Sequence, residues 1–143
     1  MGPRVNFVFA APNSITSFDF SNAPKLKEVV FRVKTETARW MTLALQTITP
    51  DHRDFRQISI RMPKLDPSSI VDPTNLRRTP TYSQWMDLDR VLVQLWESHE
   101  IRPKVIYEVW ENGKEAMREY VGCLFPEITD KGIIEVEPRI LQT

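Results

Sequence analysis

One spacing of apolar residues recurs along the chain and limits the folds open to it. The stretches "LKEVVFRV" (residues 26–33) and "FRQISIRM" (residues 55–62) both place apolar side chains at their first, fourth, sixth and eighth positions. The alternation within each stretch predicts a β-strand, because successive side chains of a strand point to opposite faces. Related patterns occur in "PKVIYEV" (residues 103–109) and "GIIEVE" (residues 132–137). These recurrences indicate one structural unit that is repeated.

The intervals between these strands predict the domain organisation. Alignment of the strand centres makes Val29, Ile58, Val105 and Ile133 equivalent, at intervals of 29, 47 and 28 residues. The middle interval becomes ordinary if residues 63–80, which contain four prolines, form an inserted surface loop. We therefore predict a single repeat-built domain over residues 1–143. Its strands are expected at residues 27–33, 55–62, 104–109 and 132–136, with a further partial strand in "VNFVFA" near the start.

Three helices are expected between the strands, because apolar residues recur there at intervals of three and four. The first covers about residues 38–48 and starts from a cap at Thr35 or Thr37. The second starts at Thr81 or Ser83, and the third covers about residues 114–125. The predicted apolar faces are Trp40, Leu43, Ala44 and Ile48 in the first helix, Trp85, Leu88, Leu92, Leu95 and Trp96 in the second, and Met117, Tyr120, Val121 and Leu124 in the third.

The alternation of strands and helices favours an α/β fold with a mainly parallel sheet. A sheet covered by helices on both faces has nearly continuous apolar strands. These strands instead carry charged residues such as Lys27, Arg32 and Glu108, so one face should be open to solvent. Repeats of 28 to 29 residues with a full helix match the long form of the leucine-rich repeat. The expected architecture is a short leucine-rich-repeat-like solenoid, with four to five strands and all helices on one face.

The chain also resembles a known family. The stretches "NAPKLKEVVFRV", "RWMTLALQTITPDHRDFRQISIRMP" and "YSQWMDLDRVLVQLWESHEIRPKVIY" are similar to the C-terminal leucine-rich-repeat-like region of fungal (basidiomycete) F-box-type proteins. The resemblance covers nearly all of the chain from Asn22 onwards, and no F-box precedes the repeats. In such proteins the F-box docks on a ubiquitin-ligase scaffold and the repeats bind a target. The resemblance therefore implies a protein–protein interaction module, the target-binding part of a ubiquitin-ligase adaptor-like protein.

Composition excludes several classes of partner. Lys and Arg total 19, as do Asp and Glu, so the chain has no strong field for nucleic acid or an anionic membrane. It contains no apolar run long enough to span a membrane. A single cysteine excludes an internal disulfide, which favours an intracellular protein, cytoplasmic or nuclear. We expect no cofactor and no metal, since two distant histidines and one cysteine lack zinc-site spacing.

An alternative is a small α/β hydrolase-like enzyme. His52 lies between two aspartates in "PDHRD" and His99 between two glutamates in "ESHEIR", and a carboxylate can orient a histidine as a general base. Both histidines are expected to be exposed at helix C-terminal ends, where they complement the helix dipole. Cys123 has apolar neighbours, which predicts a buried and inert thiol. The favoured prediction is therefore a binding protein without enzymatic activity.

The expected partner-binding face comprises Arg32, Arg61, Glu108 and Trp110 at the ends of the strands. Lys34, Lys64 and Glu111 are expected to line or rim the same face.

The two ends of the array differ in sequence. At the C-terminal edge, Glu135, Glu137 and Pro138 discourage pairing with another strand, whereas Val5, Phe7, Val8 and Phe9 make the N-terminal edge apolar. Self-association through the N-terminal edge is therefore expected. A further alternative is an orphan protein with only this self-associating, structural role.

Overall fold

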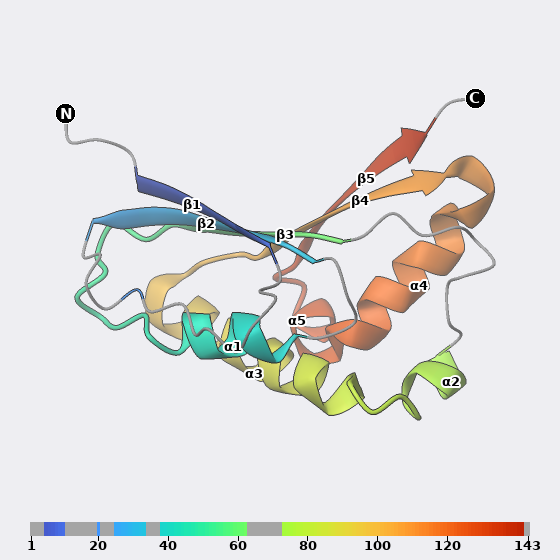
Figure 1. Cartoon of the computed structure of the whole chain (residues 1–143), viewed down its shortest axis with the longest axis horizontal. Helices are drawn as coiled ribbons and strands as arrows, with labels where there is room; N and C mark the ends of the chain where they lie inside the picture. Colours follow the sequence, from blue (N-terminus) through green and yellow to red (C-terminus); the bar gives the residue numbers. More distant parts are fainter. Residues whose placement is uncertain (1–4, 11–19, 21–24, 34–37, 63–72, 142–143) are drawn as a thin grey trace.

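The computed structural model describes residues 5–10, 20, 25–33, 38–62 and 73–141. Five strands form one sheet, in which the order along the chain is also the order in space (Figure 1). All four strand pairs are parallel. The strands are β1 (Val5–Ala10), β2 (Leu26–Arg32), β3 (Gln57–Arg61), β4 (Lys104–Trp110) and β5 (Glu135–Leu141). The fold is therefore α/β with a parallel sheet, as the sequence predicts.

The helices lie together on one side of this sheet (Figure 1). They are α1 (Arg39–Leu45), α2 (Pro73–Leu76), α3 (Tyr82–His99), α4 (Lys114–Leu124) and α5 (Pro126–Asp130), with a short 3-10 turn, η2 (Glu111–Gly113), before α4. Within the described ranges, no helix covers the opposite side of the sheet. We call that side the open face.

The core lies between the sheet and the helices. Val29, Phe31, Ile58, Ile60 and Val105 alternate along β2, β3 and β4 and are fully buried. The predicted apolar face of α4 is buried as well, and so are the predicted residues of α3 except Trp96, which is half-buried. Trp40 and Trp85, predicted on the apolar faces of the first two helices, are buried and make edge-to-face ring contacts, Trp40 with Phe31 of β2 and Trp85 with Phe125. The prediction that these two tryptophans pack in the core is thus confirmed.

The register corrects the predicted alignment of the repeats. Val29 pairs with Ile58 as expected, but Val105 pairs with Ile60 instead of Ile58. That shift of two residues leaves the same side chains facing the helices, because the side-chain period of a strand is two.

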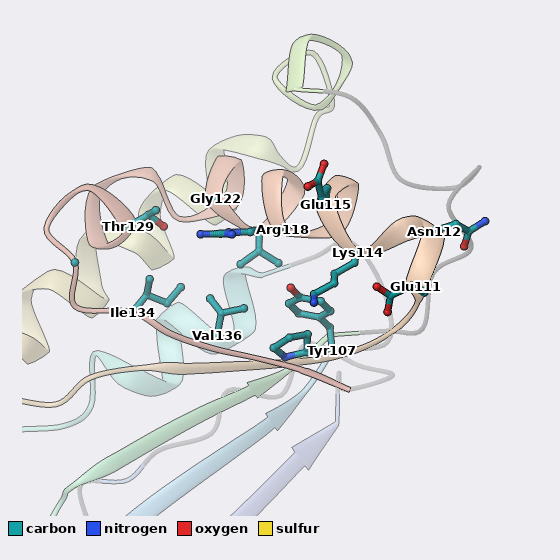
Figure 2. A pocket seen from close by; sticks show the side chains of 13 residues that line it. Tyr107, Glu111, Asn112, Lys114, Glu115, Arg118, Gly122, Thr129, Ile134 and Val136 are labelled. Carbon is teal, nitrogen blue, oxygen red and sulfur yellow. The ribbon is translucent and has the colours of Figure 1, made fainter. Parts of the chain in front are cut away.

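For the last strand the observed register is further from the predicted alignment, since Val105 pairs with Val136 and not with Ile133. The prediction for residues 132–136 missed α5 and the turn after it, in which Gly132 has a φ of 70°. Ile133 lies in this connection and is buried there, and the strand begins only at Glu135. In the register of β4, Val136 faces the helix layer, where it lines an open cleft between β5 and α4 (Figure 2).

The first helix is shorter than expected. It ends at Leu45 instead of Ile48, and Leu43, predicted to be buried, is 38% exposed. The predicted caps Thr35 and Thr37 lie outside the described residues. Helix α1 begins after Ala38, and the side-chain Oε1 of Gln84 on α3 accepts the backbone N–H groups of Ala38 and Arg39 at 3.0 and 3.1 Å. A contact from a distant helix therefore caps this terminus.

The predicted loop at residues 63–80 is described only in its second part, since residues 63–72 lie outside the described ranges. That second part is not simply an exposed loop, because it contains α2, whose Leu76 is buried in the core. Arg77 and Arg78, which follow α2, are exposed, as a surface loop at residues 63–80 predicts.

Candidate functional site

The open face carries the polar residues of the strands. Its composition follows from the register: Arg32 lies opposite Arg61, Arg61 opposite Ile106, and Glu108 opposite Arg139. These residues alternate with the core residues that face the helices. All four residues predicted for partner binding, Arg32, Arg61, Glu108 and Trp110, thus lie on the open face.

Three of these residues, Arg32, Arg61 and Glu108, line a shallow depression of about 270 Å³ near the carboxyl ends of the strands. Arg139 of β5 completes its charged lining, which brings three guanidinium groups against one carboxylate. In parallel sheets the carboxyl ends of the strands are a common place for ligands. We call Arg32, Arg61, Glu108 and Arg139 the arginine depression.

Arg32 and Arg61 form an unusual pair within this depression. They are direct neighbours on adjacent parallel strands, which lie about 4.8 Å apart in a sheet. Like charges directly opposite one another destabilise a sheet. In the described part of the chain neither arginine makes an ion pair, and the Nε of Arg61 is buried without a hydrogen-bond partner. Within the described residues, no ion pair therefore offsets the positive charge of these two arginines.

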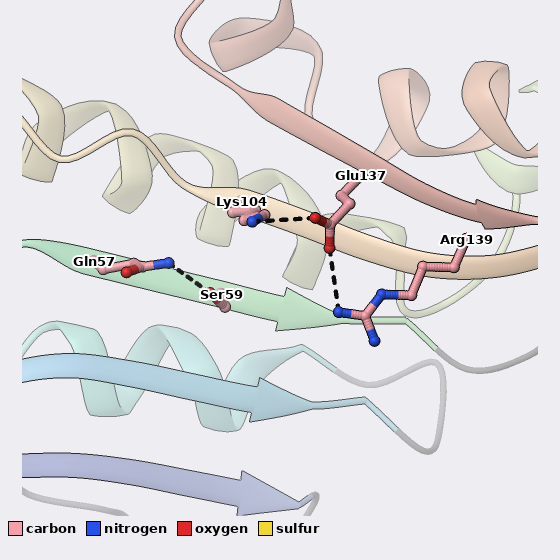
Figure 3. A network of polar contacts seen from close by, with 5 residues as sticks. All are labelled: Gln57, Ser59, Lys104, Glu137 and Arg139. Atoms are coloured by element: carbon pink, nitrogen blue, oxygen red, sulfur yellow. Dashed lines mark hydrogen bonds and ion pairs between the residues drawn. The ribbon is translucent and has the colours of Figure 1, made fainter.

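Arg139 differs, because it belongs to a polar network on the neighbouring strands (Figure 3). The carboxylate of Glu137 lies 3.4 Å from the Lys104 ammonium and 3.3 Å from the Arg139 guanidinium. The hydrogen bond from Lys104, assisted by Arg139, holds the pKa of Glu137 below its ordinary value of 4.5. On β3, the side-chain amide of Gln57 donates to the Ser59 hydroxyl. This network gives the cations of the β4–β5 side a carboxylate partner, whereas Arg32 and Arg61 have no ion pair within the described residues.

The fourth predicted residue, Trp110, follows Glu108 by two positions on β4 and therefore lies on the open face as well, but it is half-buried and does not line the depression. One residue expected at the rim of the face falls elsewhere. Glu111 was expected on the open face, and this is wrong: it belongs to η2 and lines the cleft between α4 and β5 (Figure 2). Lys34 and Lys64 lie outside the described residues. Arg139 is not among the predicted residues, because the last strand was expected to end at residue 136.

The two histidines adopt structural positions. His52 was expected to be exposed but is 2% exposed, so that prediction is wrong. Its Nδ1 accepts the Thr49 N–H at 2.9 Å, which leaves the proton on Nε2, and Nε2 donates to the Phe20 carbonyl at 2.7 Å. His99 approaches the Thr49 carbonyl with Nε2 at 3.2 Å and the Ser98 hydroxyl with Nδ1 at 2.8 Å.

These contacts do not form a general-base arrangement. Among the described residues neither histidine is in hydrogen-bond or ion-pair contact with a carboxylate. Cys123, predicted to be buried, is partly exposed. Within the described ranges, His, Cys, Asp and Glu side chains form no group of three or more able to hold a metal ion. None of the helices described is both long and apolar enough to cross a membrane.

No protein-family model, curated protein or solved structure matches this chain. The likeness to the repeats of F-box-type proteins therefore rests on the residues quoted above and stays a prediction.

Proposed function

We propose that this chain is a protein–protein interaction module that binds an acidic segment of its partner at the arginine depression. The observation that carries the proposal is the register of Arg32 with Arg61: two neighbouring guanidinium groups without an ion pair in the described part of the chain. A guanidinium binds a carboxylate or phosphate through two parallel hydrogen bonds, so a glutamate, aspartate or phosphorylated side chain suits the pair.

The shape of the site supports a macromolecular partner over a small substrate. The depression is shallow, it lies on a sheet face that no described helix covers, and its charged residues come from four strands. An enzyme site usually encloses its substrate in a deep, mostly apolar pocket. A broad polar face with few deep features is typical of a surface that contacts another protein.

The architecture fits the same proposal at a coarser level. Parallel strands in sequential order with helices on one side are what a leucine-rich-repeat-like solenoid would give, and solenoids bind partners on their strand face. We therefore propose an intracellular target-binding module, related to the repeat region of ubiquitin-ligase adaptors. In that role the open face holds the target.

Paired charge reversals test this function. The variant R32E/R61E reverses two charges in the depression, and R77E/R78E reverses two adjacent exposed charges after α2, on the helix side. A partner identified by crosslinking the wild-type chain should bind R77E/R78E with unchanged affinity. It should bind R32E/R61E at least about tenfold more weakly, since a charged hydrogen bond contributes about 1.5–3 kcal/mol. Equal losses in both variants would contradict the proposed site.

A second experiment addresses the adaptor role. In cells, ubiquitin attached to that partner should decrease when R32E/R61E replaces the wild-type chain. If the partner binds the wild-type chain but the amount of ubiquitin attached to it does not change, the chain is an interaction module and the adaptor role is refuted.

A further inference from the structure

The cleft between α4 and β5 lies on the helix side of the sheet, and Tyr107 lines both this cleft and the arginine depression. It encloses about 960 Å³. Its apolar lining comprises Val121, Ile134, Val136 and Pro138, and Val136 is 39% exposed. Figure 2 shows Ile134 and Val136 on the strand side of the opening, with Arg118 and Lys114 on the helix side. The cleft thus combines an aliphatic surface with two cations, and two carboxylates, Glu111 and Glu115, also line it.

A buried tyrosine points into this cleft. Tyr107 of β4 is 2% exposed, and its ring rises from the strand towards Arg118 and Lys114 (Figure 2). Its hydroxyl has no hydrogen-bond partner among the described residues. The hydroxyl oxygen itself is not one of the buried unpaired side-chain atoms of the described residues, which are Thr42 Oγ1 and Arg61 Nε, so it is in contact with the open cleft. A ligand oxygen in the cleft would therefore meet a donor that no described residue uses.

The charges around the hydroxyl determine the sign of that ligand. Burial raises the pKa of Tyr107 above its ordinary value of 10.0, and the positive charge of Arg118, which lines the same cleft, opposes the rise. Tyr107 is therefore a neutral donor at physiological pH. Arg118 and Lys114 make no ion pair within the described ranges, although Glu111 and Glu115 also line the cleft. One hydroxyl donor beside an unpaired guanidinium suits a carboxylate.

We propose that the cleft between α4 and β5 binds a small monocarboxylate with an aliphatic body. The carboxylate accepts hydrogen bonds from the Tyr107 hydroxyl and the Arg118 guanidinium, and the aliphatic body covers Val121, Ile134 and Val136. Burial of this apolar surface supplies most of the affinity, and the two donors select an anionic head over a neutral one.

Titration calorimetry of the full chain with decanoate tests the proposal. Acetate, which lacks the aliphatic body, and decanol, which lacks the charge, are the comparison ligands. We expect decanoate to bind and both comparison ligands to bind at least about tenfold more weakly, given the contributions of apolar burial and of a charged hydrogen bond. Equal binding of decanol and decanoate, or no binding of decanoate, would overturn the proposal.

Single substitutions test whether decanoate binds in this cleft. Y107F removes only the hydroxyl and preserves the ring, so its thermal unfolding should resemble that of the wild type while its affinity for decanoate falls. R118Q removes the charge, and R90Q, an exposed position on α3 outside this cleft, is its matched control. If the affinity for decanoate falls as much in R90Q as in R118Q, or falls in neither variant, the proposed site is refuted. A dimer that depends on Arg118 in sedimentation experiments would refute it too, because the cleft would then be a contact between copies of the chain.

Discussion

The carboxylate of Asp89 on α3 accepts the backbone N–H of Ile128 at 3.1 Å, although 39 residues of chain separate the two. The other carboxylate oxygen accepts the N–H of Glu127 at 2.9 Å. Asp89 is 3% exposed, so it binds the free N–H groups at the start of α5 inside the protein. This contact fixes the short α5 against α3 and thereby sets where β5 begins.

Replacement of Asp89 by Asn should destabilise the protein. An amide keeps one acceptor oxygen and turns a donor towards the other N–H, and a buried unpaired donor costs about 1–3 kcal/mol. Asp87→Asn, two residues earlier and exposed on the same helix, is the control and should change the free energy of unfolding little. Denaturant unfolding of both variants at one pH measures the difference. Equal stability of D89N and the wild type would mean that the cap is not needed.

The same carboxyl predicts a dependence on pH. Burial, the largest effect, raises the pKa of Asp89 above its ordinary value of 3.8, and the backbone hydrogen bonds oppose that rise. A carboxyl with a raised native pKa stabilises the fold below the unfolded pKa, and this contribution is lost as pH rises through the native pKa. The stability difference between wild type and D89N should therefore narrow as pH increases from about 4. A difference that widens over this range would show that the hydrogen bonds outweigh burial.

Gln84 should act as a cap for α1 from a distance. Gln84→Ala removes the acceptor of the Ala38 and Arg39 N–H groups and should cost about 0.5–2 kcal/mol, as loss of an N-cap does. Gln94→Ala changes an exposed residue of the same helix and should have almost no effect. Chemical denaturation compares the two. If hydrogen exchange at α1 stays as slow in the Gln84 variant as in the wild type, the cap does not hold that helix.

Substitutions of two leucines compare a core position with a surface position. Leu92 of α3 is fully buried, and Leu92→Ala should cost about 2–5 kcal/mol through lost burial and the cavity that remains. Leu43→Ala makes the same chemical change at a residue that is 38% exposed, and its effect should be much smaller. Thermal and denaturant unfolding measure both. Similar losses at the two positions would contradict the packing of α3 against the sheet.

The two edge strands of the sheet should differ in how readily they pair with another copy of the chain. Strands β1 and β5 are the two edges of the sheet. Pro138 has no N–H to offer another strand, which disfavours pairing along β5. We expect concentration-dependent association through β1, and Val8→Lys should reduce it because a charge on an edge strand opposes pairing. Sedimentation velocity compares this variant with Ile140→Lys on β5. Association lost only in the β5 variant would place the contact at the C-terminal edge instead.

The sequence alone determined the features that depend on local periodicity. The alternation in the strands and the steps of three and four in α3 and α4 predicted the type of each element and most of its buried residues. Charged residues on the strands predicted a face without helices, and all four candidate residues lie on that face, three of them in the depression. A strand exposes every second side chain, so a repeated pattern at the strand ends is enough to bring Arg32 and Arg61 to one surface.

Contacts between distant residues decided the rest. Helix α5 has only five residues and no periodic face of its own, and it is held by Asp89 from another helix. Its presence moved the last strand by three residues relative to β4 and brought Arg139 beside Glu108. His52 became buried because its ring bonds the Phe20 carbonyl, a partner 32 residues away. Such long-range hydrogen bonds leave no periodic signal, so register, helix caps and the unpaired Tyr107 hydroxyl became visible only once the elements had packed together.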